Sequence, residues 1–519
     1  MIEKKKLAAM SCGALVSLCG LTVGVHGQSC GLAELTTIQG VNTLNGWDTS
    51  VGRFGFAVDG AGDVNNDGYD DVIIGGYNDW IDPADFGAGT VNNPGYVKVI
   101  SGNGYAELFV KLGPSSGSHF GTAVSGAGDI NNDGFDDFIV GAQIASSFRG
   151  QAFVYSGATG AELSYSPITG GSAGDLTARF VSGGQDANND TTPDIVVGEY
   201  YNDTVNGTDS GSVAVYNGAN GSLLWRVNGN NANDLFGWFL NFVGDVNNDG
   251  YDDVAVGAPL ADVGALTNSG YLRVLSGLNG SAIYTSDFQG TLNGGRFGSY
   301  VDGVGDIDGD GYDDFIIGAP GEESAITGGR AYLISGQTGL TLKVFTGFTP
   351  GESYGSSLAG VGDINGDTTP DFVVAGPGFS SGRGAVYLYS GAGPHYEILA
   401  IMEGDNPGDN LGYTVAGAGD VNNDGVPDII AGGADANNFT GYARIYSGAS
   451  TFPLCSCADV NTDGAVTASD VSTVFSFLNQ DCSTSNNVPL CNSADINGNG
   501  VIDEYDYVSV LAFFCQDCP

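Results

Sequence analysis

The sequence predicts an all-β fold, a seven-bladed β-propeller with four-stranded blades, followed by a small α-helical C-terminal domain. Three observations lead to this prediction. An Asp-rich string recurs seven times, each copy sits in the same order of apolar and alternating segments, and the composition changes after residue 453. The 87 glycines fit a fold with many tight turns and short strands.

The N-terminal residues 1–27 have the pattern of a secretory signal peptide. Residues 2–6 are basic, residues 7–25 are mostly apolar, and Val25 and Gly27 offer a cleavage site before Gln28. The alternative, a retained membrane anchor, is weakened by the glycines of a segment barely long enough to span a bilayer. The mature chain is therefore expected to be secreted and to have no membrane span.

The repeats define the predicted propeller over residues 28–452. The first Asp of each copy recurs at intervals of 57 to 66 residues, at Asp63, Asp129, Asp186, Asp245, Asp306, Asp363 and Asp420. An aromatic-Gly pair such as Phe54-Gly55 precedes it, with degenerate copies at Phe180-Val181 and Leu411-Gly412. An apolar run, an alternating strand that ends in Ser-Gly, and a further short strand follow, which makes four strands in each copy.

The two ends of this region predict how the ring closes. The last copy stops at Gly448 without a fourth strand, whereas residues 32–39 resemble the fourth strands of the other copies. We expect residues 32–39 to supply the outer strand of the last blade, so that no large sheet edge stays open.

Each Asp-rich loop has the pattern of a calcium site. Oxygen side chains at positions 1, 3, 5 and 9, with Gly at position 6 for the bend and a carbonyl at position 7, form a hard-oxygen shell. A simple Asn/Asp-Gly hairpin explains the Gly but not the Asp at position 9. The predicted ligands of the five loops with Gly are Asp63, Asn65, Asp67, Tyr69, Asp71, Asp129, Asn131, Asp133, Phe135, Asp137, Asp245, Asn247, Asp249, Tyr251, Asp253, Asp306, Asp308, Asp310, Tyr312, Asp314, Asp420, Asn422, Asp424, Val426 and Asp428.

Two loops carry threonine in place of Gly. Their predicted ligands are Asp186, Asn188, Asp190 and Asp194, with Thr191, and Asp363, Asn365, Asp367 and Asp371, with Thr368. A β-branched residue disfavours positive φ, so these two loops are expected to be weaker or rearranged. Position 8 is Asp in four copies and Pro in three, which indicates that it is not needed for binding.

Together these motifs resemble the FG-GAP repeats of the integrin α-subunit head. The resemblance covers about residues 30–450, where the Phe-Gly pair, the acidic loop and the Gly-Ala-Pro segment recur in one order. It implies a seven-bladed propeller with calcium in the blade loops and an extracellular recognition platform.

Residues 453–519 contain two further loops. Oxygen ligands are predicted at Asp459, Asn461, Asp463 and Asp470, and at Asp495, Asn497, Asn499 and Asp506, each before an apolar, helix-like segment. Paired loop-helix units of this EF-hand-like form resemble dockerin domains, which implies two more Ca²⁺ sites and a cohesin-like or surface partner. Six of the nine cysteines lie in this region and suggest disulfides of unassigned pairing.

Charge and motif content limit the function. The net charge of −45 argues against nucleic acid or an anionic membrane as a partner. No Ser nucleophile elbow, zinc cluster or phosphate loop is present, and beyond the signal only His119 and His395 remain as histidines, so no catalytic residue is assigned. Aromatics of the insertions, such as Trp80, Tyr200 and Tyr201, could contact a ligand or simply pack.

The sequence therefore favours a secreted, cell-surface, calcium-binding module that binds or displays a protein or glycan ligand and is attached through its C-terminal domain. Two alternatives stay open. One is a calcium-dependent polysaccharide lyase or glycosidase, whose site would assemble from distant loops. The other is a structural component of a surface or matrix.

Overall fold

The computed structural model describes residues 32–41, 43–44, 47–48, 52–77, 94–324, 327–393 and 396–448. All of them belong to one compact unit, Gly31–Phe452. The predicted signal peptide and the two C-terminal loop-helix units lie outside the described residues.

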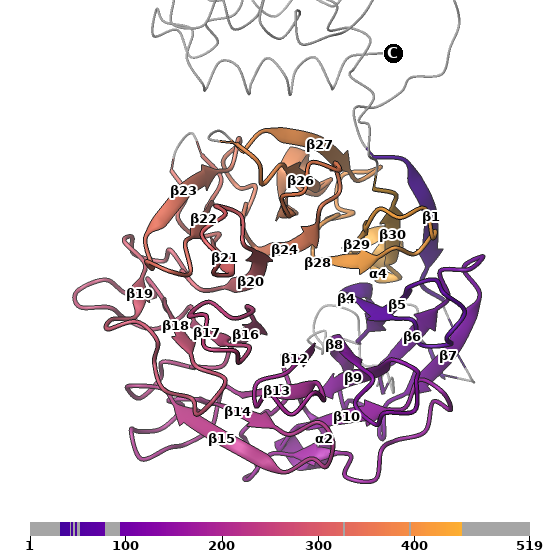
Figure 1. Ribbon diagram of the computed structural model, residues 1–519, viewed down its shortest axis with the longest axis horizontal. Helices are drawn as coiled ribbons and strands as arrows, with labels where there is room; N and C mark the ends of the chain where they lie inside the picture. The colour runs from indigo at the N-terminus through magenta and orange to yellow at the C-terminus, as the bar shows by residue number, and fades with distance from the viewer. Residues whose placement is uncertain are drawn as a thin grey trace, which may run out of the picture. The chain divides into compact units, whose positions relative to one another are not determined.

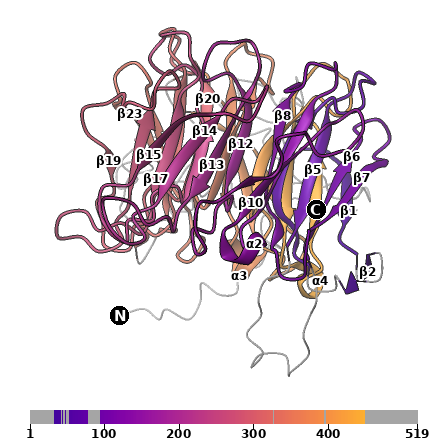
Figure 2. The same ribbon diagram turned by 90° about the horizontal axis from the view of Figure 1, so that it is seen from below.

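Seven four-stranded antiparallel sheets surround a common centre as the blades of a propeller, which confirms the predicted fold (Figure 1). Figure 2 shows the strands running between the two faces of the ring. From the inner to the outer strand, the first six blades are β4 (Phe54–Gly62), β5 (Asp71–Gly76), β6 (Tyr96–Ile100), β7 (Glu107–Leu112); β8 (Phe120–Gly128), β9 (Asp137–Ala142), β10 (Gln151–Tyr155), β11 (Ile168–Thr169); β12 (Val181–Gln185), β13 (Asp194–Glu199), β14 (Ser212–Tyr216), β15 (Leu223–Asn228); β16 (Phe239–Phe242), β17 (Val254–Ala258), β18 (Tyr271–Leu275), β19 (Phe288–Gln289); β20 (Tyr300–Gly305), β21 (Asp314–Ala319), β22 (Arg330–Ile334), β23 (Thr341–Thr346); and β24 (Ser357–Gly362), β25 (Asp371–Gly376), β26 (Ala385–Tyr389), β27 (Ile398–Glu403).

The seventh blade is built from both ends of the propeller. Its strands are β28 (Val415–Gly419), β29 (Asp428–Gly433), β30 (Tyr442–Tyr446) and, outermost, β1 (Glu34–Gln39). The register pairs Gln39 with Tyr442 and Glu34 with Tyr446. The predicted closure by the N-terminal strand is therefore confirmed, and β30 is hydrogen-bonded on both sides.

The aromatic-Gly pairs join neighbouring blades. The N–H of Phe54 donates to the Thr440 carbonyl at 3.1 Å, and the N–H of Phe120 donates to the Pro94 carbonyl at 3.2 Å. A Cβ on Gly55, whose φ is +87°, would lie 2.1 Å from the Tyr442 carbonyl oxygen, so only glycine fits this approach. The motif thus starts each inner strand against the preceding blade.

The third blade departs from the sequence prediction. Thr177, not Phe180, forms the parallel bridge to the preceding blade, through Gly150, that Phe120 forms through Gly95. Phe180 instead lies beside Phe239, with ring centroids 4.5 Å apart. Assigning Phe180-Val181 to the aromatic-Gly position was wrong because an aromatic residue was given more weight than the correct spacing.

The core is divided among the blade interfaces. The second strands are fully buried along their length, as in β5, β9 and β21, because both faces are covered by neighbouring sheets. Smaller elements are the strand pair β2 (Thr43–Leu44) and β3 (Trp47–Asp48), and the four-residue helical turns α2 (Ala145–Phe148), α3 (Phe379–Gly382) and α4 (Ala436–Phe439). Among the described residues, no helix is long and apolar enough to cross a membrane.

Candidate metal centres

The Asp-rich loops join the first and second strand of each blade. In the first blade, the Asp63 carboxylate accepts hydrogen bonds from the N–H groups of Asp67 at 3.0 Å and Gly68 at 2.8 Å. Equivalent pairs of bonds recur in the other six loops, made by Asp129, Asp186, Asp245, Asp306, Asp363 and Asp420. The position-1 carboxylate therefore shapes the turn before any ion is considered.

The position-9 carboxylates are the most buried part of each loop. Asp71 has no solvent exposure, and its Oδ1 accepts the N–H of Gly102 at 3.0 Å. The glycine of the Ser-Gly stop makes this bond in every blade; in the third, where Asn precedes it, the residue is Gly218. The Ser-Gly motif, interpreted from sequence as a strand end, thus anchors the deepest predicted ligand. The glycine, which is present in every copy, was the signal that could have revealed this role.

Burial raises the pKa of the position-9 carboxyls. It raises the pKa of Asp71, Asp137, Asp194, Asp314 and Asp428 to about 7, that of Asp253 to about 8 and that of Asp371 to about 6. The other carboxylates of the same loop add to the increase by repulsion. A cation in the loop would reverse this effect, because it favours the ionised form.

Position 3 lies against position 9. In five loops an Asn amide faces the buried carboxylate, as in the 3.0 Å contact between Asn131 Nδ2 and Asp137 Oδ2. The fifth blade has Asp308 there instead, and carboxylate oxygens of Asp306, Asp308 and Asp314 all lie within 4.8 Å of one another. No side-chain amide lies in this group to offset the repulsion, and among the described residues only backbone N–H groups donate to Asp306 and Asp314.

The residues present fit Ca²⁺. The donor set consists of carboxylates, amide side chains and backbone carbonyls, which are the hard oxygen ligands that Ca²⁺ takes in sets of six to eight. Three like-charged groups brought as close as Asp306, Asp308 and Asp314 repel strongly without a cation. The fifth blade therefore carries the clearest candidate centre, and the other six loops share its backbone frame.

The two threonine loops are not rearranged. Thr191 and Thr368 adopt φ values of 73° and 75°, and their N–H groups donate to Asp186 and Asp363 as glycine does elsewhere. Of the two outcomes expected for these loops, rearrangement is wrong, and weaker binding of the ion stays a prediction. The hydrogen bonds of the loop hold the backbone in a conformation that threonine alone disfavours, at a cost of about 1–3 kcal/mol for each such residue.

Position 8 links each loop to the preceding blade. Asp136 Oδ2 accepts the N–H of Asp63 at 2.9 Å, and Asp70, Asp252 and Asp313 make the same bond to Asp420, Asp186 and Asp245. At the other three junctions Pro193, Pro370 and Pro427 pack against Gly128, Gly305 and Gly362. Position 8 thus joins neighbouring blades and is not one of the predicted ligands. Sequence alone did not reveal this role, because the bonding partner lies in another copy.

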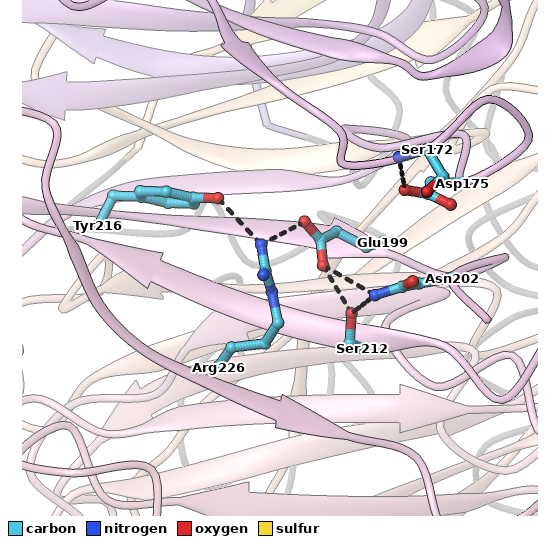
Figure 3. A network of polar contacts seen from close by, with 7 residues as sticks. All are labelled: Ser172, Asp175, Glu199, Asn202, Ser212, Tyr216 and Arg226. Carbon is cyan, nitrogen blue, oxygen red and sulfur yellow. Dashed lines mark hydrogen bonds and ion pairs between the residues drawn. The ribbon is translucent and has the colours of Figure 1, made fainter. Parts of the chain in front are cut away.

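A long insertion of the third blade, residues 199–210, begins with a buried acid that is fully paired. Glu199, at the end of β13, accepts hydrogen bonds from Ser212 Oγ at 2.6 Å and from Arg226 Nη2 at 2.8 Å (Figure 3). Asn202 completes the group. Nearby Tyr200 is 4% exposed and packs on Trp238, so it does not present a face to a ligand. Trp80 lies outside the described residues.

In four blades a buried acid closes the turn two residues before the first position of the aromatic-Gly motif. Asp175, Asp234, Glu352 and Asp409 each accept the N–H of the residue three positions earlier. The fifth blade has Gly295 at this position, and Glu322 occupies the space beside it and accepts the Thr291 N–H at 3.0 Å. These carboxylates have a structural explanation and need no ligand.

The comparisons with known proteins agree with this architecture. Models of the FG-GAP repeat match residues 120–158, 236–275 and 300–333, and an FG-GAP-like repeat model matches 363–431. A dockerin type I domain model matches 457–513, which includes the predicted ligands Asp459, Asn461, Asp463, Asp470, Asp495, Asn497, Asn499 and Asp506, all outside the described residues.

Curated relatives are integrin α-subunits. Integrin alpha-V of Gallus gallus is 32% identical over 205 residues, 37% of this chain and 19% of the relative. Integrin alpha-6 of Gallus gallus is 34% identical over 153 residues, 28% of this chain and 14% of the relative. The chain thus spans less than a fifth of these relatives. Among solved structures, Sqt1 of Saccharomyces cerevisiae aligns with a TM-score of 0.45 at 10% identity, covering 82% of this chain and 100% of that one.

Fold and loops define a β-propeller with Asp-rich, oxygen-ligand loops in its blades. More particularly, the chain carries integrin α-like FG-GAP repeats followed by a C-terminal dockerin type I domain.

Proposed function

We propose that this protein is a secreted, calcium-loaded binding or display module. Its propeller presents a protein or glycan ligand site, and its dockerin domain attaches it to a cohesin partner outside the cell. One observation carries the proposal: FG-GAP repeats and a type I dockerin occur in one chain. The acidic oxygen clusters of the loops support calcium as the ion, and the paired state of Glu199 supports binding over catalysis.

Attachment and ligand binding are tested separately with the full mature chain. Immobilised type I cohesin should capture the chain in CaCl₂ and release it in EDTA, because dockerin loops need their ion. A variant in which Asp463 and Asn499, one predicted ligand from each C-terminal loop, are both changed to Ala is the matched control and should not be captured. Failure of every cohesin tested to capture the chain would contradict attachment.

Glycan and protein arrays probed in CaCl₂ test the propeller. Specific, EDTA-sensitive binding is expected. Depolymerisation of a polysaccharide by the purified chain would contradict the binding proposal and favour the lyase or glycosidase alternative.

Calcium occupancy is tested in the fifth blade. Asp308→Asn converts its position 3 to the residue found in the other loops, so it should still bind, whereas Asp314→Ala should lose one equivalent of calcium. Equilibrium dialysis gives the stoichiometry. An unchanged equivalent in Asp314→Ala would contradict the assignment.

A further inference from the structure

The centre of the ring holds a cavity of about 740 Å³ that neither the metal loops nor the proposed attachment uses. Inner strands of all seven blades line it, and Figure 1 looks along this centre. Because each blade contributes the same positions of its inner strand, the lining falls into layers that can be compared from blade to blade.

One layer is a polar belt. It lies four residues before the first Asp of each loop and consists of Asp59, Ser125, Ser182, Asn241, Asp302, Ala359 and Ala416. Members contact the next blade. Asp59 accepts the N–H of Gly126 at 3.2 Å, Ser125 accepts that of Gly183 at 3.2 Å, and Asp302 accepts that of Gly360 at 3.0 Å.

These contacts require a hydrogen-bond acceptor at the belt positions, but they do not require that the acceptor be a carboxylate. Ser125 makes with a hydroxyl the bond that Asp59 makes with a carboxylate, and Ala416 fills the position with no polar group at all. Both acids are half-buried on the cavity wall, and this partial burial is costly for folding because it disfavours their ionised forms. Two belt carboxylates therefore exceed what joining the blades requires.

The charge of Asp59 also acts on Asp302. Burial raises the pKa of Asp59 to about 7, and burial together with the charge of Asp59 raises the pKa of Asp302 to about 8. The Asn241 amide donates to Asp302 at 2.6 Å, while Ser182 donates to the amide oxygen of Asn241, so this side of the belt is fixed. A positive charge in the channel would relieve the repulsion between the acids.

A second layer, three residues nearer the start of each inner strand, is partly aromatic. It includes Phe56, Trp238 and Tyr413, and the rings of Phe56 and Tyr413 lie 4.9 Å apart. The Arg179 guanidinium, in the same layer, lies 4.5 Å from the centroid of Trp238, so this wall already accommodates a cation on an aromatic face. The cavity therefore combines two acids with apolar contact area, which is offered mainly by Phe56 and Tyr413 because Arg179 lies over Trp238; Arg179 and Arg296 are the cations of the lining.

We propose that the central channel binds an alkylammonium ion, with its charged nitrogen between Asp59 and Asp302 and its hydrocarbon chain against the aromatic layer. A divalent metal fits less well. It needs six or more oxygen ligands gathered around one point, and the belt brings two carboxylates, Asp59 and Asp302, from two different blades. An ammonium group needs only a few acceptors, and its hydrocarbon body uses the rings.

The test is calorimetric titration of the full mature chain with n-butylammonium chloride in excess CaCl₂, at a pH where both acids are ionised. The neutral analogue n-butanol is the matched ligand control. We expect saturable binding of n-butylammonium and none of n-butanol. Asp59→Ser and Asp302→Ser copy the residue that the second and third blades carry, keep an acceptor, and should each weaken binding about tenfold or more.

In the titration, the proposal would be overturned by no binding of n-butylammonium to the wild type, by equal binding of n-butanol, or by unchanged affinity in the double serine variant. Loss of one calcium equivalent in that variant would show a metal site instead and would also overturn it. Calcium-dependent thermal unfolding confirms that each variant is folded. Asp59→Asn/Asp302→Asn, closer in shape, should show the same loss of affinity if the serine variant does not fold.

Discussion

The carboxylate of Asp136 offers the sharpest test of how the blades hold one another. Its Oδ2 accepts the Asp63 N–H at 2.9 Å, while the backbone N–H of Asp136 donates to the Asp63 carbonyl at 3.3 Å. Asp136→Ala removes only the first bond. A hydrogen bond to a charged group contributes about 1.5–3 kcal/mol, and its loss leaves the part-buried Asp63 N–H without this acceptor.

Repulsion from neighbouring carboxylates reduces the free energy that this hydrogen bond contributes. Burial raises the pKa of Asp136, and the charges of Asp70, Asp129 and Asp63 raise it further, so part of the bond's contribution is already offset in the folded protein. We therefore expect Asp136→Ala to lower the free energy of unfolding by about 1–2 kcal/mol. Asp136→Asn keeps an oxygen acceptor without the charge and should lose about half as much.

Urea unfolding of the mature chain in excess CaCl₂, followed by tryptophan fluorescence, measures the effect as a shift in midpoint at constant slope. Glu323→Ala is the control, because it removes an exposed carboxylate and the same unit of charge. If Asp136→Ala unfolds at the same urea concentration as Glu323→Ala, position 8 does not join the blades and the reasoning is refuted.

Three further outcomes follow from the same contacts. Deleting residues 32–40 removes β1 and exposes the edge of β30, so calorimetry should show a lower melting temperature and size-exclusion chromatography should show association; an unchanged monomer would contradict closure. Glu322→Ala leaves the Thr291 N–H and Arg330 without their carboxylate and should lower the free energy of unfolding by about 2–4 kcal/mol. Adding Gly295→Asp to this variant should restore part of the lost stability, measured by urea unfolding. No recovery would contradict the inference that Glu322 takes the place of the acid found before the motif in other blades. The folded pKa values of Asp59 and Asp302, about 7 and about 8, lie above the ordinary 3.8, so these acids take up protons on folding. Wild-type stability should therefore fall as pH rises from about 4 to about 8, and the melting temperature of the double serine variant should rise relative to that of the wild type over this range. A melting-temperature difference that changes in the opposite direction would contradict the burial of these acids.

The sequence was sufficient for features that repeat within one blade. Seven copies in one order predicted the blades, and the missing strand after Gly448 predicted the closing role of residues 32–39. These inferences succeed because strand periodicity and turn chemistry are local, so each copy is an independent observation of the same unit.

Features that depend on two blades were missed. The sequence indicated only that Asp136 is not needed for metal binding, and its role between blades was missed because its partner, Asp63, lies in the preceding copy. Glu322 carried no signal, since its role follows from a glycine at 295. In the third blade, the motif was assigned to Phe180 because it is aromatic, three positions after Thr177, which holds the equivalent place. Contacts between copies vary in residue type while keeping their geometry, so pattern alone does not reveal them.

The placement of β30 has a mechanical consequence. The chain leaves β30 at Tyr446 towards the C-terminal residues, and β30 is flanked by β29 and β1 along its whole length. Tension applied from the C-terminal side pulls this strand lengthwise. The bonds to both neighbours then share the load and must shear together, instead of opening one at a time from an edge. A tether attached at the C-terminal end of β30 would therefore load the sheet in the direction in which it resists force best.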